Sequence, residues 1–301
     1  MTKQRIRIGT RGSKLALWQA NFTKVELEKL GVEVELNIIK TKGDQIQHLS
    51  FDKIEGKGFF TKEIEEALLR EEVDMAVHSM KDLPTTSPEG LKTTAVSYRE
   101  NPADWLVIRK ERAEEGAVLR LPQGAIVGTS SARRKAQMLD FRSDVQLKDI
   151  RGNVPTRLQK LASGDYDAIL LAAAGLTRLE MALDDFEIIK LNPKEFVPAP
   201  AQGVLAFQTR TDDLDTRRLL KQLHHAEVAL RSTLVRKVLQ LLDGGCHMPL
   251  GVYCEMDQHE NYHVWAAKAD SWDGPVKRVR LSSSTKFELA EQVVAQLTNP
   301  T

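Results

Sequence analysis

Hydrophobic and polar positions repeat with two different periods along the N-terminal part of the chain. Arg5–Gly9 alternates residue by residue, as in a strand with one buried face. The apolar positions that follow, from Leu15 to Val25, recur at helical spacing. The same reasoning predicts further strands at 32–39 and 74–79 and a helix at 61–70. Because strands and helices alternate in this order, the pattern predicts a mostly parallel sheet with helices on its faces.

The same order of elements returns in the middle of the chain. The pattern predicts strands at 125–128, 145–150 and 168–175, a helix that opens at Thr129 and another helix at 153–161. Proline-containing stretches at 99–104 and 196–203 flank this second unit and are typical of crossings between lobes. Two crossings indicate a hinge, and a strand at 204–208 is expected to return the chain to the first lobe.

A third pattern begins near Leu219. It predicts a long helix at 219–242, strands at 251–256, 263–269 and 276–281, and a closing helix at 286–297. We therefore expect an α/β protein with two hinged lobes that resemble periplasmic-binding-protein domains, followed by an α+β domain with a three-stranded antiparallel sheet. The expected boundaries are 1–98 plus 202–217 for the first lobe, 99–201 for the second lobe and 218–301 for the α+β domain.

Composition and charge narrow the classes of function. The chain has 301 residues, of which 42% are hydrophobic and 28% are charged, enough to bury the cores of several domains. Its net charge of +1 and its 6% aromatic content give neither a long basic track nor a stacking platform, which argues against a nucleic-acid binder. No run is long enough to span a membrane, and Met1–Arg7 leads into a strand without the apolar stretch of a signal peptide. We expect a cytoplasmic protein.

Hydroxyl and cationic side chains follow several of the predicted strands. In α/β units such turns lead into helix N-termini, whose free N–H groups attract anions. Each residue taken singly also fits a helix cap or a solvated basic face. Their recurrence at equivalent turns favours a ligand with several carboxylate or phosphate groups. The residues at these turns are Arg11, Ser13, Ser79, Lys81, Thr129, Ser130, Ser131, Arg133, Arg134, Arg151 and Arg157.

Asp82 is a carboxylate placed among these cations. It fits either a structural ion pair or a fixed negative charge that faces a cation developing on a substrate. The histidines of the chain raise the separate question of a metal site. His78, His224 and His225 lack a third ligand at a spacing that zinc selects, so we expect no metal site.

The two cysteines of the chain lie in different settings. Cys254 belongs to an alternating strand and is expected to pack as an inert apolar side chain. Cys246 follows two glycines and precedes Pro249, so its sulfur lies on a backbone-defined turn, as a nucleophile or an attachment point would. The spacing of the two thiols fits neither a disulfide framework nor a metal site.

Taken together, several segments resemble the porphobilinogen deaminase family, also called hydroxymethylbilane synthase. The resemblance runs nearly from end to end and rests on the order and spacing of its motifs. In chain order they are T-R-G-S-K-L-A-L-W-Q, G-K-G-F-F-T-K-E, A-V-H-S-M-K-D-L-P, V-G-T-S-S-A-R-R, R-G-N-V-P-T-R-L, D-A-I-L-L-A-A-A-G-L, A-Q-G and G-G-C-H-M-P-L-G.

The resemblance implies a transferase of heme and other tetrapyrrole biosynthesis. Such an enzyme joins four porphobilinogen molecules head to tail with loss of ammonia and releases hydroxymethylbilane by hydrolysis. Its primer would be a dipyrromethane cofactor, bound through a thioether to Cys246. A soft sulfur nucleophile can capture the electrophilic methylene of a deaminated pyrrole, and the tether keeps the growing chain at a high effective concentration.

The resemblance also implies roles for individual residues. Asp82 would hold pyrrole N–H groups and stabilise positive charge as ammonia leaves. Phe60 would cover a pyrrole ring, and Ser79 and Gln202 would line the cleft. The segment 48–58 resembles a mobile active-site loop whose glycines permit motion. The acetate and propionate arms of cofactor and substrate would be bound by Arg11, Ser13, Lys81, Thr129, Ser131, Arg133, Arg134, Arg151, Arg157 and Arg178.

One stretch departs from the pattern R-E-D-P-R-D that is common in the family. This chain has Asn101 and Ala103 there, so an acid and an arginine are lost together. Our hypothesis is that these two charges pair elsewhere in the family and that their joint loss alters motion between lobes more than chemistry. Ala103→Arg alone should then lower stability or activity.

A different class of function also fits part of the pattern. Two hinged lobes with cationic turns describe non-enzymatic anion-binding proteins and effector-binding domains as well. That reading leaves the third domain, Asp82 and the glycine-framed Cys246 without a use. We therefore expect an enzyme that acts on the small molecule porphobilinogen, without nucleic-acid or membrane partners. Because the sequence shows no long apolar heptad or obvious sticky strand, we expect a monomer.

Overall fold

The computed structural model describes residues 5–41, 61–245 and 248–299. Phe60, Cys246 and the segment 48–58 lie outside the described residues. The described chain forms two sheets of five strands and one sheet of three strands. It divides into two compact units, the first with residues 5–41, 61–100 and 203–230 and the second with residues 101–202, 231–245 and 248–299. Among the helices of these described ranges, none is both long and apolar enough to cross a membrane.

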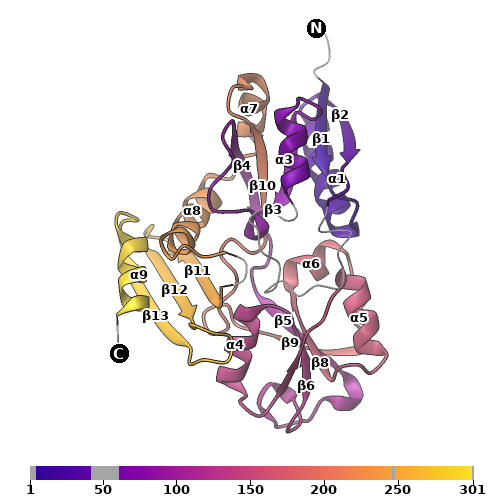
Figure 1. Cartoon of the computed structure of the whole chain (residues 1–301), viewed down its shortest axis with the longest axis vertical. Helices are drawn as coiled ribbons and strands as arrows, with labels where there is room; N and C mark the ends of the chain where they lie inside the picture. The colour runs from indigo at the N-terminus through magenta and orange to yellow at the C-terminus, as the bar shows by residue number, and fades with distance from the viewer. Residues whose placement is uncertain (1–4, 42–60, 246–247, 300–301) are drawn as a thin grey trace. The chain divides into compact units, whose positions relative to one another are not determined.

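The first unit is built on a mixed sheet with the strand order β2-β1-β3-β10-β4. Its strands are β1 (Arg5–Thr10), β2 (Glu33–Ile38), β3 (Met75–Ser79), β4 (Leu91–Arg99) and β10 (Val204–Arg210). β1 pairs in parallel with β2 and β3, and β10 runs antiparallel between β3 and β4 (Figure 1). The predicted return of the chain at 204–208 is confirmed, whereas the sequence pattern does not predict β4.

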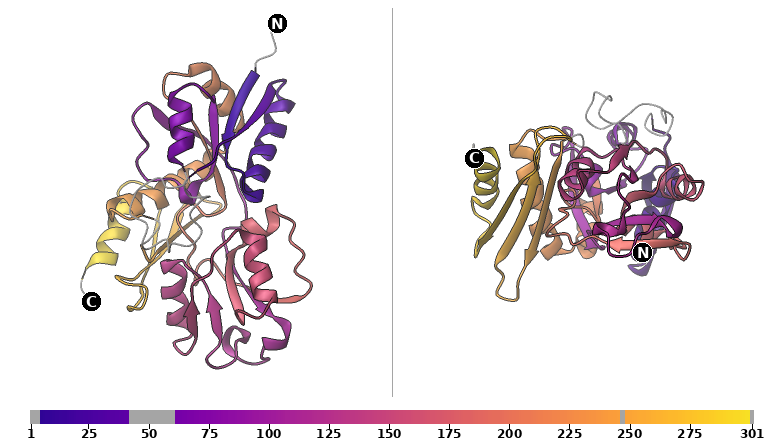
Figure 2. Two further views of the ribbon diagram at one scale, coloured as in Figure 1. Left: turned by 45° about the vertical axis from the view of Figure 1, so that its right-hand side comes forward. Right: turned by 90° about the horizontal axis from the view of Figure 1, so that it is seen from below.

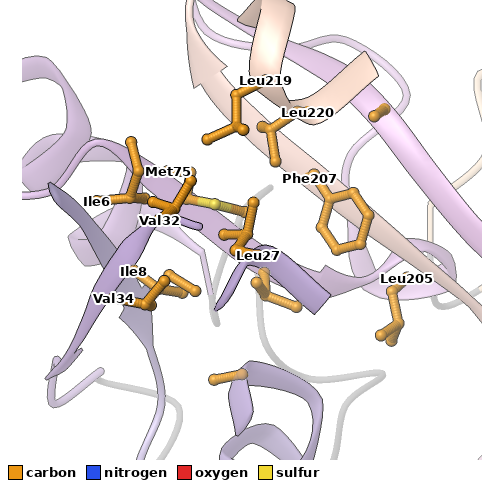
Figure 3. Packing of buried hydrophobic residues seen from close by; sticks show 13 residues of the cluster. Ile6, Ile8, Leu27, Val32, Val34, Met75, Leu205, Phe207, Leu219 and Leu220 are labelled. Atoms are coloured by element: carbon orange, nitrogen blue, oxygen red, sulfur yellow. The ribbon is translucent and has the colours of Figure 1, made fainter. Parts of the chain in front are cut away.

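Apolar side chains cover both faces of this sheet. Leu27 of helix α1 (Lys14–Lys29) packs with Met75 of β3 and Phe207 of β10 (Figure 3). Leu219 and Leu220 of α7 (Leu214–Leu220) join this cluster. On the other face, α3 (Lys62–Leu69) contributes its buried apolar residues. Because β3 is covered on both faces, it is apolar until its last two positions, where the polar site residues begin.

The second unit repeats this plan with the strand order β7-β6-β8-β5-β9. Its strands are β5 (Asp104–Arg109), β6 (Ile126–Gly128), β7 (Gln146–Lys148), β8 (Ala168–Ala172) and β9 (Phe186–Lys190). β6 pairs in parallel with β7 and β8, and β5 runs antiparallel between β8 and β9. The sequence pattern does not predict β5 or β9, but the α/β class that it predicts is confirmed.

The helices of this unit follow the parallel strands. They are α4 (Ala132–Phe141), α5 (Val154–Ala162) and α6 (Ala173–Arg178). The prediction of one strand over 168–175 is wrong at its end, because β8 stops at Ala172 and α6 begins at Ala173. A run of buried alanines is compatible with either a strand or a helix, and alanine has the strongest intrinsic helix propensity.

The predicted α+β domain contains an antiparallel sheet in the order β11-β12-β13. Its elements are β11 (Leu250–Met256), β12 (Tyr262–Lys268), β13 (Lys277–Ser283) and α9 (Leu289–Thr298). α9 lies on one face of this sheet (Figure 2). Of the predicted domain, residues 218–230 belong to the first unit and residues 231–245 and 248–299 to the second unit, and the separate domain from 218 stays a prediction.

The long helix predicted at 219–242 is broken. α7 ends at Leu220, a 3-10 turn covers Lys221–Leu223, and α8 runs over Ala226–Leu241. The residues between them bond to β4 instead of continuing the helix: Val96 N donates to His224 Nδ1 at 3.3 Å, and His225 N donates to Val96 O at 3.0 Å. A tertiary contact therefore overrides a local pattern that favours one helix.

β11 packs tightly against the second crossing segment. A Cβ added at Gly251 would lie 2.3 Å from Val197 O, so only glycine allows this approach. The next residue, Val252, donates its N–H to Pro198 O at 3.0 Å. The start of the three-stranded sheet is thereby fixed to the segment that leads back to the first unit.

Candidate functional site

The carboxyl end of β3 carries three of the predicted site residues. Ser79 ends the strand, and Lys81 and Asp82 follow in a 3-10 turn. Ser79 Oγ accepts a hydrogen bond from Gln19 Nε2 of α1 at 2.9 Å, which ties the strand end to the helix. Lys81 is half-buried and Asp82 is exposed. The turn therefore presents a solvent-accessible carboxylate next to a cation in the sequence.

Arg11 and Ser13 follow β1, which lies beside β3 in the sheet. Ser13 is the N-cap of α1, and its Oγ accepts a hydrogen bond from Ala16 N at 3.3 Å. Arg11 is half-buried and close enough to His78 for its charge to act on that imidazole. Because β1 and β3 are parallel, their carboxyl ends meet at one edge of the sheet. The first unit thus brings the predicted residues of both turns together.

In the second unit, Arg133 and Arg134 both pair with Asp104, the first residue of β5. Arg133 Nη1 lies 2.6 Å from Asp104 Oδ2, and Arg134 Nη2 lies 2.7 Å from Oδ1. All three side chains are buried. Burial acts to raise the pKa of Asp104, but the charges and hydrogen bonds of the two guanidinium groups outweigh it and hold that pKa well below its usual range. Two guanidinium groups share the charge of Asp104, so the three groups together remain positive.

Glutamine side chains fix the backbone around this network. Gln202 Nε2 donates to Pro102 O at 2.8 Å and to Asp104 Oδ1 at 2.9 Å, which joins the two crossing segments. Gln137 of α4 accepts from Val197 N at 2.7 Å and donates to Val197 O at 2.9 Å. The sequence predicted Gln202 as a site residue but gave no role to Gln137 or Asp104.

The hydroxyl groups after β6 bond to the local backbone. Thr129 is buried, and its Oγ1 accepts from Ser131 N at 3.3 Å. Ser130 Oγ donates to Ile150 O at 2.8 Å and accepts from Ile150 N at 3.0 Å. Ser131 is the N-cap of α4 and accepts from Arg134 N at 3.5 Å. Binding of a ligand by Thr129 and Ser131 stays a prediction.

Arg151 lies on the turn from β7 into α5, and Arg157 lies at the start of α5. Gly152 has a φ of +113°, in the region that favours glycine, and Arg157 Nε donates to its carbonyl oxygen at 2.7 Å. Burial, followed by the positive charges of Arg134 and Arg151, lowers the pKa of Arg157 to about 10. Arg178 ends α6 and is buried. A guanidinium group whose neighbours disfavour its charge is suited to bind an anion.

Other predicted residues have a simpler outcome. Cys254 is buried in β11, which confirms its predicted packing role. Cys246 and Phe60, the predicted attachment point and ring cover, lie outside the described residues. Within the part of the chain that the structure describes, no group of three or more His, Cys, Asp or Glu side chains could hold a metal ion.

Known proteins resemble this chain over most of its length. Residues 6–218 match a family model described as porphobilinogen deaminase, dipyromethane cofactor binding domain. The porphobilinogen deaminase of Chloroherpeton thalassium is 44% identical over 294 residues, which cover 97% of this chain and 92% of that protein. The porphobilinogen deaminase of Nitratidesulfovibrio vulgaris is 44% identical over 297 residues, with 96% and 92% covered. Among solved structures, a Salmonella typhimurium periplasmic binding protein with high arginine specificity has a TM-score of 0.40 and 13% identity, covering 75% of this chain and 96% of that chain.

Proposed function

Because the chain belongs to the porphobilinogen deaminase family, we propose that it joins four porphobilinogen molecules head to tail and releases hydroxymethylbilane by hydrolysis. Ammonia leaves at each joining step. In this reaction the chain acts as a transferase of tetrapyrrole biosynthesis that carries a dipyrromethane cofactor. The observation that carries the proposal is the buried guanidinium group of Arg157, which lies near the positive charges of Arg134 and Arg151 and whose pKa is lowered first by burial and then by those two charges.

These guanidinium groups suit a ligand with several carboxylates. Porphobilinogen and a dipyrromethane built from it carry an acetate and a propionate arm on each pyrrole. A carboxylate bound beside Arg157 would relieve its repulsion with Arg134 and Arg151. Arg134 already donates to Asp104 and to Leu170 O. We therefore assign direct contacts to Arg151 and Arg157, with Arg134 contributing mainly its charge.

Other cations and hydroxyl groups at the strand ends are proposed to bind the remaining arms. In the first unit the turns after β1 and β3 supply them, and in the second unit they come from the turn after β6, the start of α4 and the end of α6. Their helix N-termini add N–H groups that favour negative charge. The residues assigned in this way are Arg11, Ser13, Lys81, Thr129, Ser131, Arg133 and Arg178.

Asp82 is proposed as the catalytic carboxylate. Its exposure on the turn after β3 leaves it accessible to a substrate, and the fixed end of the strand limits where it can point. Its carboxylate oxygens would accept hydrogen bonds from pyrrole N–H groups. The same negative charge would stabilise the cation that develops as ammonia leaves, provided that water is excluded from the site.

Cys246 is proposed as the attachment point of the cofactor. The strand that follows it is anchored, since Gly251 is in close contact with Val197. Arg133 Nη1 donates to Val197 O at 3.0 Å, so this anchor lies beside the Asp104 network. When bound, the dipyrromethane supplies the pyrrole carbon to which the first substrate is joined. The cationic side chains of the second unit would hold its carboxylate arms.

Intact mass spectrometry tests the attachment. The parent protein and the control Cys254→Ser are expected to carry an added mass equal to a dipyrromethane, and Cys246→Ser is expected to carry none. A parent that is folded, active and unmodified would overturn the proposal. Separately, Asp82→Ala is expected to abolish turnover without unfolding the protein, and retained turnover would remove the role given to Asp82.

Steady-state kinetics test the anion site. Loss of a charge-assisted hydrogen bond predicts that Arg157→Gln raises the KM for porphobilinogen by about tenfold. Arg218→Gln is the matched control, because Arg218 is exposed on α7 and pairs with Asp215. An unchanged KM in Arg157→Gln would contradict the assignment.

We also propose that the enzyme acts as a cytoplasmic monomer. Light scattering of the purified holoenzyme measures the oligomeric state.

A further inference from the structure

A line of buried polar side chains runs through the first unit behind β3. Thr61 Oγ1 donates to Glu65 Oε2 at 3.2 Å, and Gln208 Nε2 donates to Glu65 Oε1 at 2.9 Å. At the other end, Gln208 Oε1 lies 3.0 Å from His78 Nε2. All four side chains are buried, with His78 6% exposed and Gln208 1% exposed. The line joins α3, β10 and the penultimate residue of β3.

The directions of these hydrogen bonds fix the state of the imidazole. Because the amide nitrogen of Gln208 donates to Glu65, its amide oxygen faces His78. His78 must then donate from Nε2, which leaves the lone pair on Nδ1. Burial lowers the pKa of His78 to about 4, the bond to Gln208 opposes that shift, and the charge of Arg11 adds to it. The groups that face His78 thus keep it neutral. The side chain of Gln208 lies between His78 and Glu65 and bonds to both.

β3 enters the site turn with a side-chain bond on each face. Successive residues of a strand point to opposite faces. His78 bonds to Gln208 on one face, and Ser79 bonds to Gln19 of α1 on the other. Lys81 and Asp82 belong to the 3-10 turn that directly follows Ser79. The backbone that aims these two side chains is therefore held from both sides of the sheet.

Strand pairing alone does not require this polar line. β3 and β10 are already paired by backbone hydrogen bonds over Met75–Ser79, and their other buried residues are mostly apolar. Apolar groups of similar shape can replace a buried polar pair at little net cost in stability. A hydrogen bond has a preferred direction and an apolar contact does not. The bond can therefore fix the orientation and position of the strand end.

We propose that His78 is a positioning residue, which acts through its bond to Gln208 and Glu65 to hold the end of β3 so that Asp82 meets the reacting centre. The inference rests on the proposed function, since Asp82 is the carboxylate that it positions. A displacement of about 1 Å at a positioned group costs roughly a hundredfold in rate. The effect of losing the bond should therefore appear in kcat more than in KM.

The test compares two substitutions at one position in the holoenzyme. His78→Leu removes the Nε2 donor and is expected to lower kcat by about tenfold or more while KM changes by less than about threefold. His78→Gln keeps an N–H donor that can reach Gln208 and is expected to restore most of kcat. If His78→Leu is folded, carries the dipyrromethane mass and keeps the parent kcat, the inference is wrong. Equal losses in both variants would also overturn it, because the donor would then not matter.

A spectroscopic measurement covers the case in which His78→Leu does not fold. Imidazole ¹⁵N NMR of the parent holoenzyme is expected to show one histidine locked as the neutral Nε2–H form between about pH 5 and pH 8, and His78→Gln removes that signal. A signal that titrates near pH 6.5, or an Nδ1–H form, would overturn the arrangement. Failure of the proposed function would look different, because the parent protein would lack the dipyrromethane mass whatever the state of His78.

Discussion

The two five-stranded sheets have the same strand plan, but the polar side chains buried around the antiparallel strand differ between them. In each sheet three parallel strands are followed by one antiparallel strand and one outer strand. In the first unit the antiparallel strand β10 contributes Gln208, which links a neutral His78 to Glu65. In the second unit the antiparallel strand β5 contributes Asp104, which lies between Arg133 and Arg134.

The difference shows what topology and side chains each decide. The strand plan places an antiparallel strand beside the third parallel strand in both sheets, so a polar side chain on it can bond to residues around that strand. The side chains decide the charge. The line through Gln208 can orient the turn after β3 without attracting an anion, whereas a network with excess guanidinium charge can bind carboxylates.

The largest expected effect comes from removing the carboxylate of the second unit. Asp104→Asn leaves two buried guanidinium groups without their counter-charge and is expected to lower the free energy of unfolding by about 3–5 kcal/mol. Denaturant unfolding followed by circular dichroism measures this change. The matched control is Asp215→Asn, an exposed carboxylate on α7 that pairs with Arg218, and it should leave the midpoint unchanged. Equal midpoints for Asp104→Asn and the parent would contradict the comparison.

The ion pairs of Asp104 also determine the direction in which stability changes with acid. The folded-state pKa of Asp104 lies below its unfolded value. Its contribution to stability is therefore present above roughly pH 4 and is lost as the pH falls further. Asp104→Asn should lack this part of the acid dependence.

The stability of the first unit should depend on acid in a higher pH range. Between pH 6.5 and about pH 4 the unfolded chain takes up a proton at His78 that the folded chain does not. Stability should fall with acid across this window, by roughly 3 kcal/mol at its lower end. Chemical denaturation at several pH values measures the slope, which His78→Gln should remove. The exposed His259 supplies the control, since His259→Gln should leave the slope as it is in the parent.

A smaller loss is expected from restoring the missing arginine. Ala103 is buried, and its carbonyl oxygen accepts from Ala173 N at 3.0 Å. Ala103→Arg adds bulk and a third cation near Arg133 and Arg134, so it should lower the free energy of unfolding by about 1–3 kcal/mol. Ala162→Arg, at the exposed end of α5, is the matched control for thermal unfolding. Higher stability together with higher activity in Ala103→Arg would disprove our account of this departure.

The smallest effect should be equal in the two units. Ser13 caps α1 after β1 and Ser131 caps α4 after β6, and each of these strands is the second in the order of its sheet. Ser13→Ala and Ser131→Ala should each lower stability by about 1 kcal/mol, and Ser→Gly at the same positions should cost less. Thermal unfolding of the four variants measures this. A much larger loss in one unit would show that its serine does more than cap the helix.

The sequence predicts local structure well where the pattern is local. Buried strands such as β3 and β8 read as apolar runs, and the polar turns that follow them are short enough to be read directly. Helix caps such as Ser13 and Ser131 also lie within a few residues of the N–H groups that they accept from. These features predicted the parallel strands β1, β2, β3, β6, β7 and β8 and the candidate turns, but not the antiparallel pairings of the two sheets.

The parts that the sequence does not predict depend on distant contacts. Asp104 lies 29 and 30 residues from the two arginines that it pairs with, so nothing in its neighbourhood identifies them. The break before α8 depends on Val96, which is 128 residues from His224. The polar line in the first unit spans 143 residues between Glu65 and Gln208. Such pairs are set by how the chain folds back, not by periodicity.

The place of β10 has a consequence for biosynthesis of the chain. β10 stands between β3 and β4, although every strand of the second sheet, within residues 104–190, is translated before it. On the ribosome the second sheet can close from continuous sequence, while the first sheet keeps open edges until residue 210 has emerged. Of the two five-stranded sheets, the one that begins first along the chain is thus completed last. A nascent chain arrested near residue 200 would lack the strand that pairs with both β3 and β4, and unpaired strand edges of this kind favour aggregation.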